Sequence, residues 1–442
     1  MKIFTLGLLI FFLSFGVSAE VSSFGELALE SRVFKDDNNS DTQDWGLGAY
    51  SQLEVNYQSG AYSHVFRGTA RVDRKDQGRN FVTFEDAYLS ARIGGGIKLL
   101  AGYKIFNWSA TEAFHSADQL NSRNYDGELE NLEKKGELTV EAEFPVHRGT
   151  FSLYYFPRFE DPQLPSSRSR IGGAGIDLGG PSVVDGMDAN SNERWVDQFG
   201  LRTVQYLDWG DLSAYALKHV NRNYPLIGTH QYGDQDLGFP FGSVFLPFDE
   251  TPTTYYLPGW QYGATAQILT DSGVLKFEGA YYKFDEHKPI FDLALYDKNS
   301  QAAKEDLLQE RDEHGEVVIG YEHQLFHDNG TQSTLLFEAV TLLGLNKEER
   351  AATSIFQRDV FLGYRFAFND TMGKELLFSM IADIERSQEF LYNLSYTQRL
   401  SNSWKIETSF RVYDAAQKGE FPQGLETLDE ASGINLTLTR FF

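Results

Sequence analysis

Apolar and polar residues alternate along most of this sequence, in stretches separated by turn-forming residues. Alternation with a period of two predicts β-strands that have one apolar and one polar face. About 18 stretches of ten to fifteen residues fit this pattern. Because boundaries set by pattern alone shift by a few residues, a count of 16 is the alternative. The stretches lie at 24–34, 45–57, 62–74, 82–93, 96–106, 136–146, 150–158, 195–207, 210–222, 254–270, 273–284, 315–326, 331–345, 356–368, 374–386, 388–400, 403–414 and 432–442.

The connections between these stretches alternate in length. Short turns lie near 58–60, 94–96, 145–149, 208–210, 270–273, 327–330, 369–373 and 401–403. Most of the intervening connections are long, and those near 159–194, 223–253 and 285–314 are expected to be extracellular loops. Short turns on one rim and long loops on the other are typical of bacterial outer-membrane barrels whose two termini lie in the periplasm. The pattern therefore predicts an all-β protein, a transmembrane antiparallel β-barrel.

The beginning of the chain has the pattern of a secretory signal peptide. Lys2 precedes an apolar run at 3–15, and the small residues of a cleavage site follow at 17–19. We therefore expect residues 1–19 to be removed before Glu20. No second apolar run reaches the length of about 18 residues that a membrane helix needs, so any membrane-spanning structure is expected to be a closed sheet.

The last strand is amphipathic and ends in an aromatic residue. Ile434, Leu436 and Leu438 share one face, and the final residue is Phe442. This strand looks like the assembly signal of outer-membrane barrels, which implies contact with the barrel-assembly machinery and with outer-membrane lipid. A secreted, water-soluble all-β protein that ends in Phe is the alternative interpretation. A monomer and a homotrimer are both consistent with the pattern.

Composition narrows the classes of partner and of stabilising chemistry. Without the signal peptide the chain has 38 basic and 63 acidic residues, a net charge of −25. A nucleic-acid partner is not expected, because binding a phosphate backbone needs basic surface. The sequence contains no cysteine, which excludes disulfides and thiolate metal sites. The 35 Phe and 23 Tyr residues fit aromatic girdles at two membrane interfaces.

Three consecutive predicted strands place basic residues on the face that the apolar pattern assigns to the lumen. The stretches 62–74, 82–93 and 96–106 supply five such cations: Arg67, Arg71, Arg92, Lys98 and Lys104. One interpretation is a basic ladder along a permeation path. The other is a set of cations that each pair with an acidic residue across the lumen. The sequence supports both interpretations.

The long connection after 96–106 mixes aromatic residues with side chains that form hydrogen bonds. A sheet of about 18 strands closes around a lumen too wide for side chains alone to fill, so a loop folded inward is expected. We predict that 107–126 is this loop. The residues expected to shape the constriction are Trp108, Glu112, Asp118, Asn121, Arg123 and Asp126.

This loop resembles part of a known family. The run from Gly102 to Trp108, followed by Phe114, Asp118, Asn121, Arg123 and Asp126, is similar to the W-G…D…N-P-R-D stretch of porin-like outer-membrane barrels of unknown function. Ser109 and Ser122 stand where that family has Gly and Pro. The resemblance implies an inward-folded segment. It also implies an envelope exporter as a partner, since such barrels are often encoded beside RND/MMPL-type exporters. Alternatively, Asp118, Asn121 and Arg123 only cap the loop and pin it to the wall.

No recognisable catalytic or cofactor-binding motif occurs in the sequence. The histidines lack a nucleophile, a base and an orienting group in a known arrangement. His323 and His327 share a strand face, but such positions lie about 13 Å apart, too far for one metal ion. We therefore expect no enzyme activity, no metal and no cofactor.

These observations favour one function and leave two alternatives. The favoured function is a porin-like channel for passive or partner-coupled passage of small solutes. The first alternative is an outer-membrane component that works with an envelope exporter of lipid or hydrophobic cargo. The second is a non-conducting surface receptor or adhesion barrel. Local lumen charge is expected to set ion selectivity, because screening confines the field of distant loop charges to about 8–10 Å.

Overall fold

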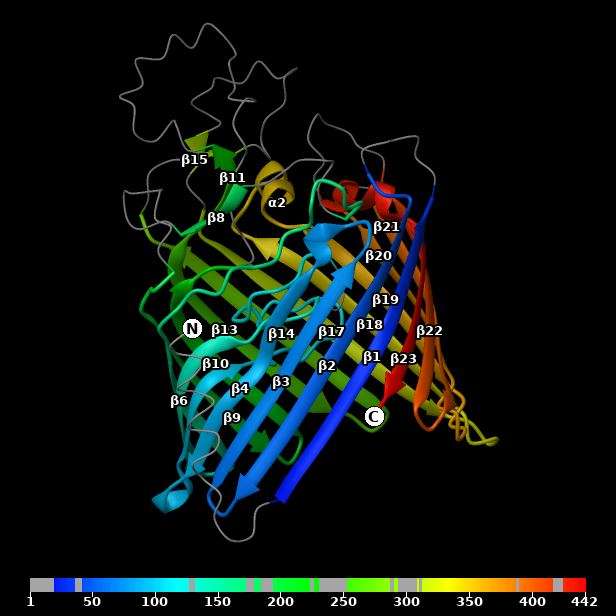
Figure 1. Cartoon of the computed structure of the whole chain (residues 1–442). Helices are drawn as coiled ribbons and strands as arrows, with labels where there is room; N and C mark the ends of the chain where they lie inside the picture. The colour runs from blue at the N-terminus through cyan, green and yellow to red at the C-terminus, as the bar shows by residue number, and fades with distance from the viewer. Residues whose placement is uncertain are drawn as a thin grey trace, which may run out of the picture.

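The structure, a computed structural model, describes residues 20–35, 42–126, 132–171, 179–183, 194–222, 226–229, 253–286, 290–292, 308–309, 312–386, 389–415 and 424–442. The expected signal peptide, 1–19, lies outside the described residues. Eighteen strands of the described part form one closed antiparallel sheet (Figure 1). The sequence-based prediction of an 18-stranded barrel is therefore confirmed, and the alternative count of 16 is wrong.

The barrel strands follow the predicted stretches closely. They are β1 (Glu20–Phe34), β2 (Trp45–Ser59), β3 (Tyr62–Asp73), β4 (Phe81–Arg92), β5 (Lys98–Lys104), β6 (Glu137–Val146), β7 (Gly149–Phe156), β9 (Gln198–Leu207), β10 (Gly210–Val220), β13 (Pro258–Leu269), β14 (Gly273–Phe284), β17 (His314–Phe326), β18 (Gln332–Leu343), β19 (Arg358–Ala367), β20 (Glu375–Asp383), β21 (Glu389–Ser401), β22 (Trp404–Asp414) and β23 (Gly433–Phe441). The first strand, β1, pairs with both β2 and β23, which closes the sheet.

Both ends of the barrel sequence lie toward the rim that has the short turns. Glu20 pairs with Gln58 beside the β2–β3 turn, and Phe441 pairs with Glu26. In that turn Gly60 has a φ of 57°, a conformation that glycine adopts without strain. We call this end of the barrel the short-turn rim, at the bottom of Figure 1, and the opposite end the long-loop rim.

The connections at the long-loop rim contain a smaller sheet that the sequence pattern did not predict. Its five strands are β8 (Gly179–Val183), β11 (Leu226–Thr229), β12 (Thr253–Tyr256), β15 (Ile290–Asp292) and β16 (Leu308–Gln309). The prediction of one strand at 254–270 is wrong, because β12 joins the small sheet and β13 begins at Pro258. Proline has no backbone N–H to donate to a sheet, which favours the first position of a strand.

Short helices occupy other connections. They are η1 (Gln77–Arg79), η2 (Gly94–Gly96), α2 (Lys347–Thr353) and η6 (Gly424–Ala431). No helix in the described residues has the length and the apolar character needed to cross a membrane.

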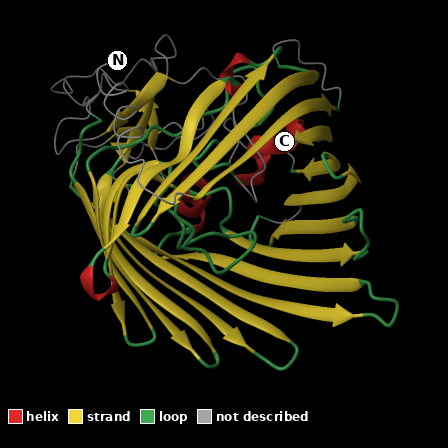
Figure 2. Ribbon diagram, turned by 60° about the horizontal axis from the view of Figure 1, so that its bottom comes forward, coloured by secondary structure: helices red, strands yellow, loops and turns green. Residues whose placement is uncertain are grey.

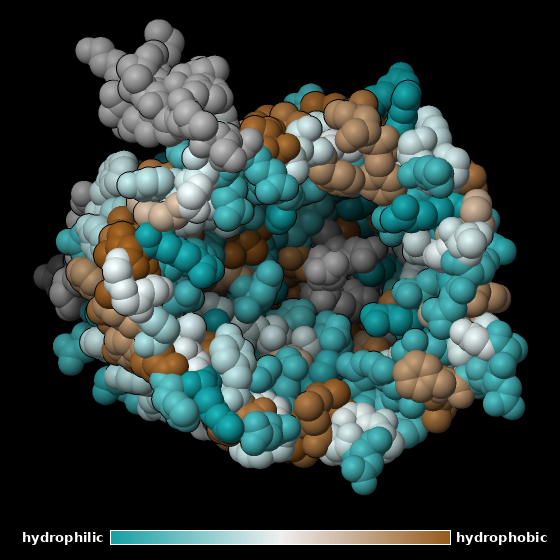
Figure 3. Space-filling view, turned by 90° about the horizontal axis from the view of Figure 1, so that it is seen from below, coloured by the Kyte–Doolittle hydropathy of each residue, from teal (hydrophilic) through white to brown (hydrophobic). Residues whose placement is uncertain are grey.

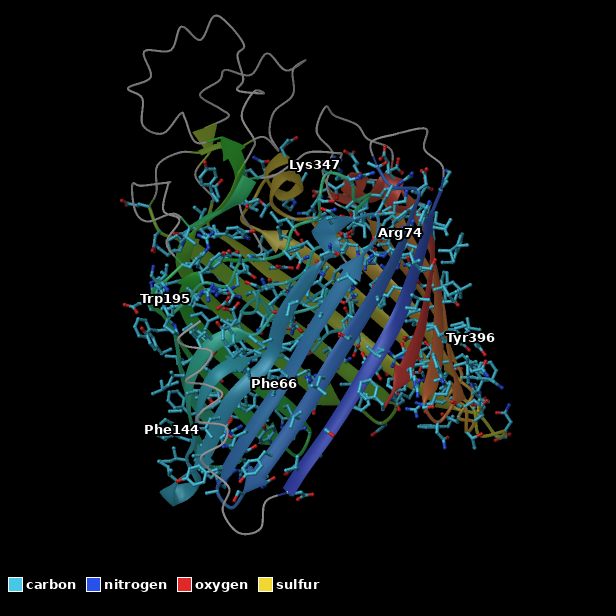
Figure 4. The ribbon with its side chains drawn as sticks, viewed as in Figure 1. Phe66, Arg74, Phe144, Trp195, Lys347 and Tyr396 are labelled. Atoms are coloured by element: carbon cyan, nitrogen blue, oxygen red, sulfur yellow. The ribbon has the colours of Figure 1, made fainter. Side chains whose placement is uncertain are left out.

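The strands separate an apolar outer face from an inner face that is largely polar. Phe66 on β3 and Tyr396 on β21 project from the outer face in Figure 4. On β23 the predicted apolar face is also outside, where Ile434 and Leu436 are exposed. Thr437 and Thr439 alternate with these residues and face the interior, because side chains on a strand point to opposite sides in turn.

A β-bulge in β4 changes which residues face the lumen. The register between β3 and β4 shifts after Arg67, which lies opposite Asp86, so that Glu85 is the extra residue. Two adjacent carboxylates therefore face inward together, and both lie within ion-pairing distance of Arg67. The alternation expected for 82–93 holds only after the bulge, from residue 86 onward.

An apolar cluster lies inside the barrel toward the long-loop rim. Inward side chains of β17 to β22 pack there against residues of the loop after β5 and of η6. Its largest members are Val318, Leu336, Val340, Phe361, Ile381, Leu391, Tyr413, Phe114, Ile171, Leu425 and Leu428. Toward the other end the barrel is hollow, and many hydrophilic side chains border the recess seen from the short-turn rim (Figure 3).

Candidate functional site

Residues 107–126, which we call the inner segment, leave the end of β5 and cross the inside of the barrel. Figure 2 shows connecting segments within the ring of strands. Hydrogen bonds join the inner segment to β14 and β18. These strands are six and eight positions from β5 around the 18-stranded sheet. The segment therefore reaches nearly the opposite wall.

Aromatic packing fixes the beginning of the inner segment. Trp108 is only 3% exposed, and its ring lies 5.6 Å from the ring of Tyr154 and 5.0 Å from that of Tyr215. The guanidinium of Arg202 lies 5.0 Å from the centre of the Trp108 ring, a cation–π geometry. Trp108 is thus buried in the wall formed by β7, β9 and β10 rather than presented to the lumen.

Polar side chains fix the other end of the inner segment, near residues 118–121, beside the end of β5. Asn121 accepts a hydrogen bond from the backbone N–H of Phe106 at 2.7 Å and donates to the carbonyls of Lys104 and Lys135. Asp118 accepts from the backbone N–H of Trp108 at 3.3 Å and pairs with the ammonium of Lys134. These contacts have the geometry of a loop cap, the role weighed in the sequence analysis for Asp118 and Asn121.

Two carboxylates on the far wall bind the middle of the inner segment. Glu278 on β14 accepts from the backbone N–H groups of Ala110, of Thr111 at 2.9 Å and of Ala117 at 2.9 Å. It also accepts from two hydroxyls, Ser109 Oγ at 2.5 Å and Thr111 Oγ1 at 2.7 Å. Glu338 on β18 accepts from the backbone N–H groups of residues 112, 113 and 114 at 2.6, 2.9 and 3.3 Å.

The side chain of Glu112 points toward the wall and takes part in an ion pair. Its Oε1 lies 2.8 Å from Nζ of Lys276, which also lies 3.0 Å from Glu322. The side chain of Glu112 is 45% exposed, whereas the other five residues expected to shape the constriction are buried. It is therefore the one placed to meet solvent in the lumen.

Arg123 and Asp126 join the inner segment to a second stretch, residues 158–171, which is buried in part. The carbonyl of Arg123 accepts from the backbone N–H of Gln163 at 3.0 Å. Asp126 Oδ1 lies 3.3 Å from Nη1 of Arg32 and accepts from Ser169 Oγ at 3.2 Å. Burial raises the pKa of Asp126 to about 6, although the guanidiniums of Arg32 and Arg79 oppose this shift. Part of the predicted loop 159–194 is thus packed against the inner segment.

The five predicted lumen cations fall into two groups. Arg67 pairs with Glu54 at 2.7 Å, Arg71 with Glu30 at 2.9 Å, and Lys104 with Glu141 at 2.7 Å. Arg92 and Lys98 lie opposite each other near the short-turn rim. No ion pair involves either of them in the part of the chain that the structure describes.

Sequence reasoning missed Glu278, Glu338 and Arg202. The alternation of 273–284 and 331–345 assigns both glutamates to the inner face, so their orientation was readable from the sequence. Their partners were not readable, because the contacts join residues that are more than 150 positions apart. Among the described residues, no group of three or more His, Asp or Glu side chains is arranged to hold a metal ion.

Comparison with known proteins finds similarity among solved structures only. No family model matches the sequence, and a search of curated proteins finds no match. Among solved structures, OccAB1 of Acinetobacter baumannii aligns with a TM-score of 0.50 and 9% identity over 96% of each chain. A BenF-like porin from Pseudomonas fluorescens Pf-5 aligns with a TM-score of 0.49 and 8% identity, over 96% of this chain and 98% of the porin. OmpF of Salmonella typhi aligns with a TM-score of 0.44 and 10% identity, over 96% of this chain and 97% of OmpF. At 9% identity the alignment with OccAB1 shows a likeness of fold alone.

Proposed function

We propose that this protein is a porin-like channel for small hydrophilic solutes in the outer membrane, narrowed by the inner segment. The observation that supports this most directly is a closed sheet whose polar inner face borders a recess at the short-turn rim (Figure 3). A water-filled path needs a polar wall, and contact with lipid needs the apolar outer face. In this proposal the short-turn rim faces the periplasm and the long-loop rim faces the exterior.

The inner wall has both basic and acidic side chains, which supports a path lined by charges of both signs. Arg67, Lys104 and Lys276 each lie within ion-pairing distance of at least one carboxylate. These pairs fit the second interpretation of the predicted basic ladder, in which lumen cations are neutralised locally. Arg92 and Lys98, near the short-turn rim, are the predicted pore-lining residues best placed to attract anions.

Single-channel recording of the refolded barrel in a planar bilayer tests the proposal. Stable conductance steps are expected, together with swelling of liposomes that contain the protein when small sugars are added outside. A barrel that folds, as judged by its resistance to detergent unfolding, yet conducts no ions would overturn the proposal. Such a result would favour the receptor or adhesion alternative. The mass of the solubilised protein distinguishes a monomer from a homotrimer, both of which the proposal allows.

A second candidate function is favoured by the apolar cluster inside the barrel. An outer-membrane component for an exporter of lipid or hydrophobic cargo, the partner that the family resemblance implies, needs apolar surface along its path. The cluster residues Leu391, Leu425 and Leu428 are fully buried, so cargo would have to displace η6 to reach them. Binding of a fluorescent fatty acid to the refolded barrel, lost on changing Leu428 to Asp, would support this candidate.

A further inference from the structure

The tip of the inner segment, residues 109–117, depends on two side chains for its backbone hydrogen bonds to the far wall. Six of its N–H groups donate to the carboxylates of Glu278 and Glu338. The tip has no helix or strand of its own to satisfy these groups. An unpaired buried N–H group is costly, so the conformation of the tip is stable only while both carboxylates remain in place.

The dependence is mutual, because the carboxylates also need the tip. Glu278 is 0% exposed and Glu338 is 1% exposed. In the part of the chain that the structure describes, no Lys or Arg lies within ion-pairing distance of either group. Buried carboxylates without a cation are stabilised by N–H groups that point at them, as in the backbone nests that bind anions. Each of the two groups accepts three such N–H groups from the tip.

The tip has further contacts with the far wall, of which the largest is apolar: Ala113 and Phe114 belong to the apolar cluster. The hydroxyl of Tyr282 donates to the carbonyl of Ser116 at 3.1 Å, and Lys276 pairs with Glu112. The two ends of the inner segment are fixed separately, by Trp108 on one side and Asn121 on the other. Loss of the carboxylates would therefore free the tip backbone from β14 and β18 and leave Ala113 and Phe114 as its main attachment to the far wall, while the two ends of the segment stay attached to their own side of the barrel.

We propose that Glu278 and Glu338 are positioning residues that fix the tip across the lumen and so set the size limit of the channel. This proposal rests on the proposed function. A tip bound to β14 and β18 narrows the barrel, whereas a released tip leaves the lumen wider and lets larger solutes pass. The two glutamates determine solute size without being required to contact the solute.

The test compares Glu278→Gln, Glu338→Gln and the double variant with the wild-type barrel. An amide of the same shape cannot accept three N–H groups as a carboxylate does, and its own NH₂ opposes the donors. Hydrogen–deuterium exchange measures the tip directly. Exchange is expected to accelerate about tenfold or more at amides 110, 111 and 117 in Glu278→Gln and at amides 112–114 in Glu338→Gln, since bonds to a charged acceptor are the strong ones. All six amides are expected to accelerate in the double variant. Single-channel conductance and the largest sugar that swells liposomes are expected to increase.

Glu322→Gln is the matched control. Glu322 also faces inward, on β17, and pairs with Lys276 at 3.0 Å, but it accepts nothing from the tip. The control is expected to leave amide exchange in the tip unchanged. Unchanged exchange in the double variant would show that the glutamates do not fix the tip. Faster exchange with unchanged conductance would overturn their role in solute size. Absence of conductance in the wild type would contradict the proposed function itself, whatever the exchange rates.

If the double variant does not fold, the single variants still decide the question. Glu338→Gln leaves Glu278 and its three amide donors intact, so only the amides at 112–114 should exchange faster. Equal acceleration at 110, 111 and 117 would show general loosening of the barrel and would overturn the assignment of separate roles.

Discussion

The cluster around Arg67 allows a quantitative prediction about ion selectivity. Its guanidinium lies 2.7 Å from Glu54, 3.3 Å from Asp86 and 3.9 Å from Glu85. The side chain of Arg67 is 33% exposed, so the cluster borders solvent in the lumen. Replacing Arg67 with Gln removes one positive charge and leaves three carboxylates on this stretch of wall. Passing cations should then be favoured over anions.

The size of the effect follows from the screened field of one charge. At about 8 Å in water a unit charge contributes about 0.5 kcal/mol. A Debye length of about 10 Å at 0.1 M salt reduces this to about 0.2 kcal/mol. Cations would be enriched and anions depleted by about 1.5-fold each, so the ratio of K⁺ to Cl⁻ permeability should rise about twofold.

Reversal potentials measured across a tenfold KCl gradient give this permeability ratio. Arg440→Gln is the matched control, because Arg440 lies on the outer face, against the ring of Trp404, and its loss changes the total charge by the same amount. The control should leave the reversal potential unchanged. A shift of Arg67→Gln toward anions, or an equal shift in both variants, would refute the reasoning that local lumen charge sets selectivity.

Three further changes should alter stability. Asp126, with a folded-state pKa of about 6 and an ordinary value of 3.8, binds more protons when folded, so the free energy of unfolding should fall by about 3 kcal/mol as pH rises from about 4 to about 6. Asp126→Asn should abolish that slope in urea unfolding; an unchanged slope would assign it to other groups. Glu137→Gln leaves the fully buried Arg222 without its carboxylate partner and should cost about 3–5 kcal/mol by the same assay, whereas a cost under about 1 kcal/mol would contradict the pairing. A Cβ at Gly149 would lie 1.9 Å from the backbone carbonyl oxygen of Val204 on the neighbouring strand, so Gly149→Ala should lower the temperature at which the barrel loses its compact electrophoretic mobility, and Gly94→Ala, in open space, should not.

The fold was predictable because each strand pattern is local. Alternation in 62–74 or 432–442 is a property of consecutive residues, and the pairing of neighbours follows from the turn between them. The prediction of one strand at 254–270 was wrong for the same reason, because it used only local alternation. Its alternation continues through Leu257, but Pro258 divides it between two sheets, and no local pattern shows that Thr253–Tyr256 pairs with β8 and β11.

The candidate site was only partly predictable. The composition of 107–126 indicated a buried polar loop, and Asn121 and Asp118 have cap contacts within it. The bulge at Glu85 could not be read from the sequence, because it depends on the register of β3 against β4. Glu278 and Glu338 were visible only as inward residues. Their role depends on a loop that crosses the lumen, and this contact is not encoded near them in the sequence.

The seam between β1 and β23 has a consequence for how the barrel is made. The backbone of Gly25 pairs with that of Phe442, at 3.0 and 2.9 Å, so the bonds that close the sheet join residues about 400 positions apart. Contacts of such sequence separation form slowly, since the chain between them must be ordered first. Until this pairing forms, β1 and β23 each have one edge without a partner strand, and such edges readily join other strands. The barrel therefore has free edges until its last strand, β23, has been made and has paired with its first strand, β1.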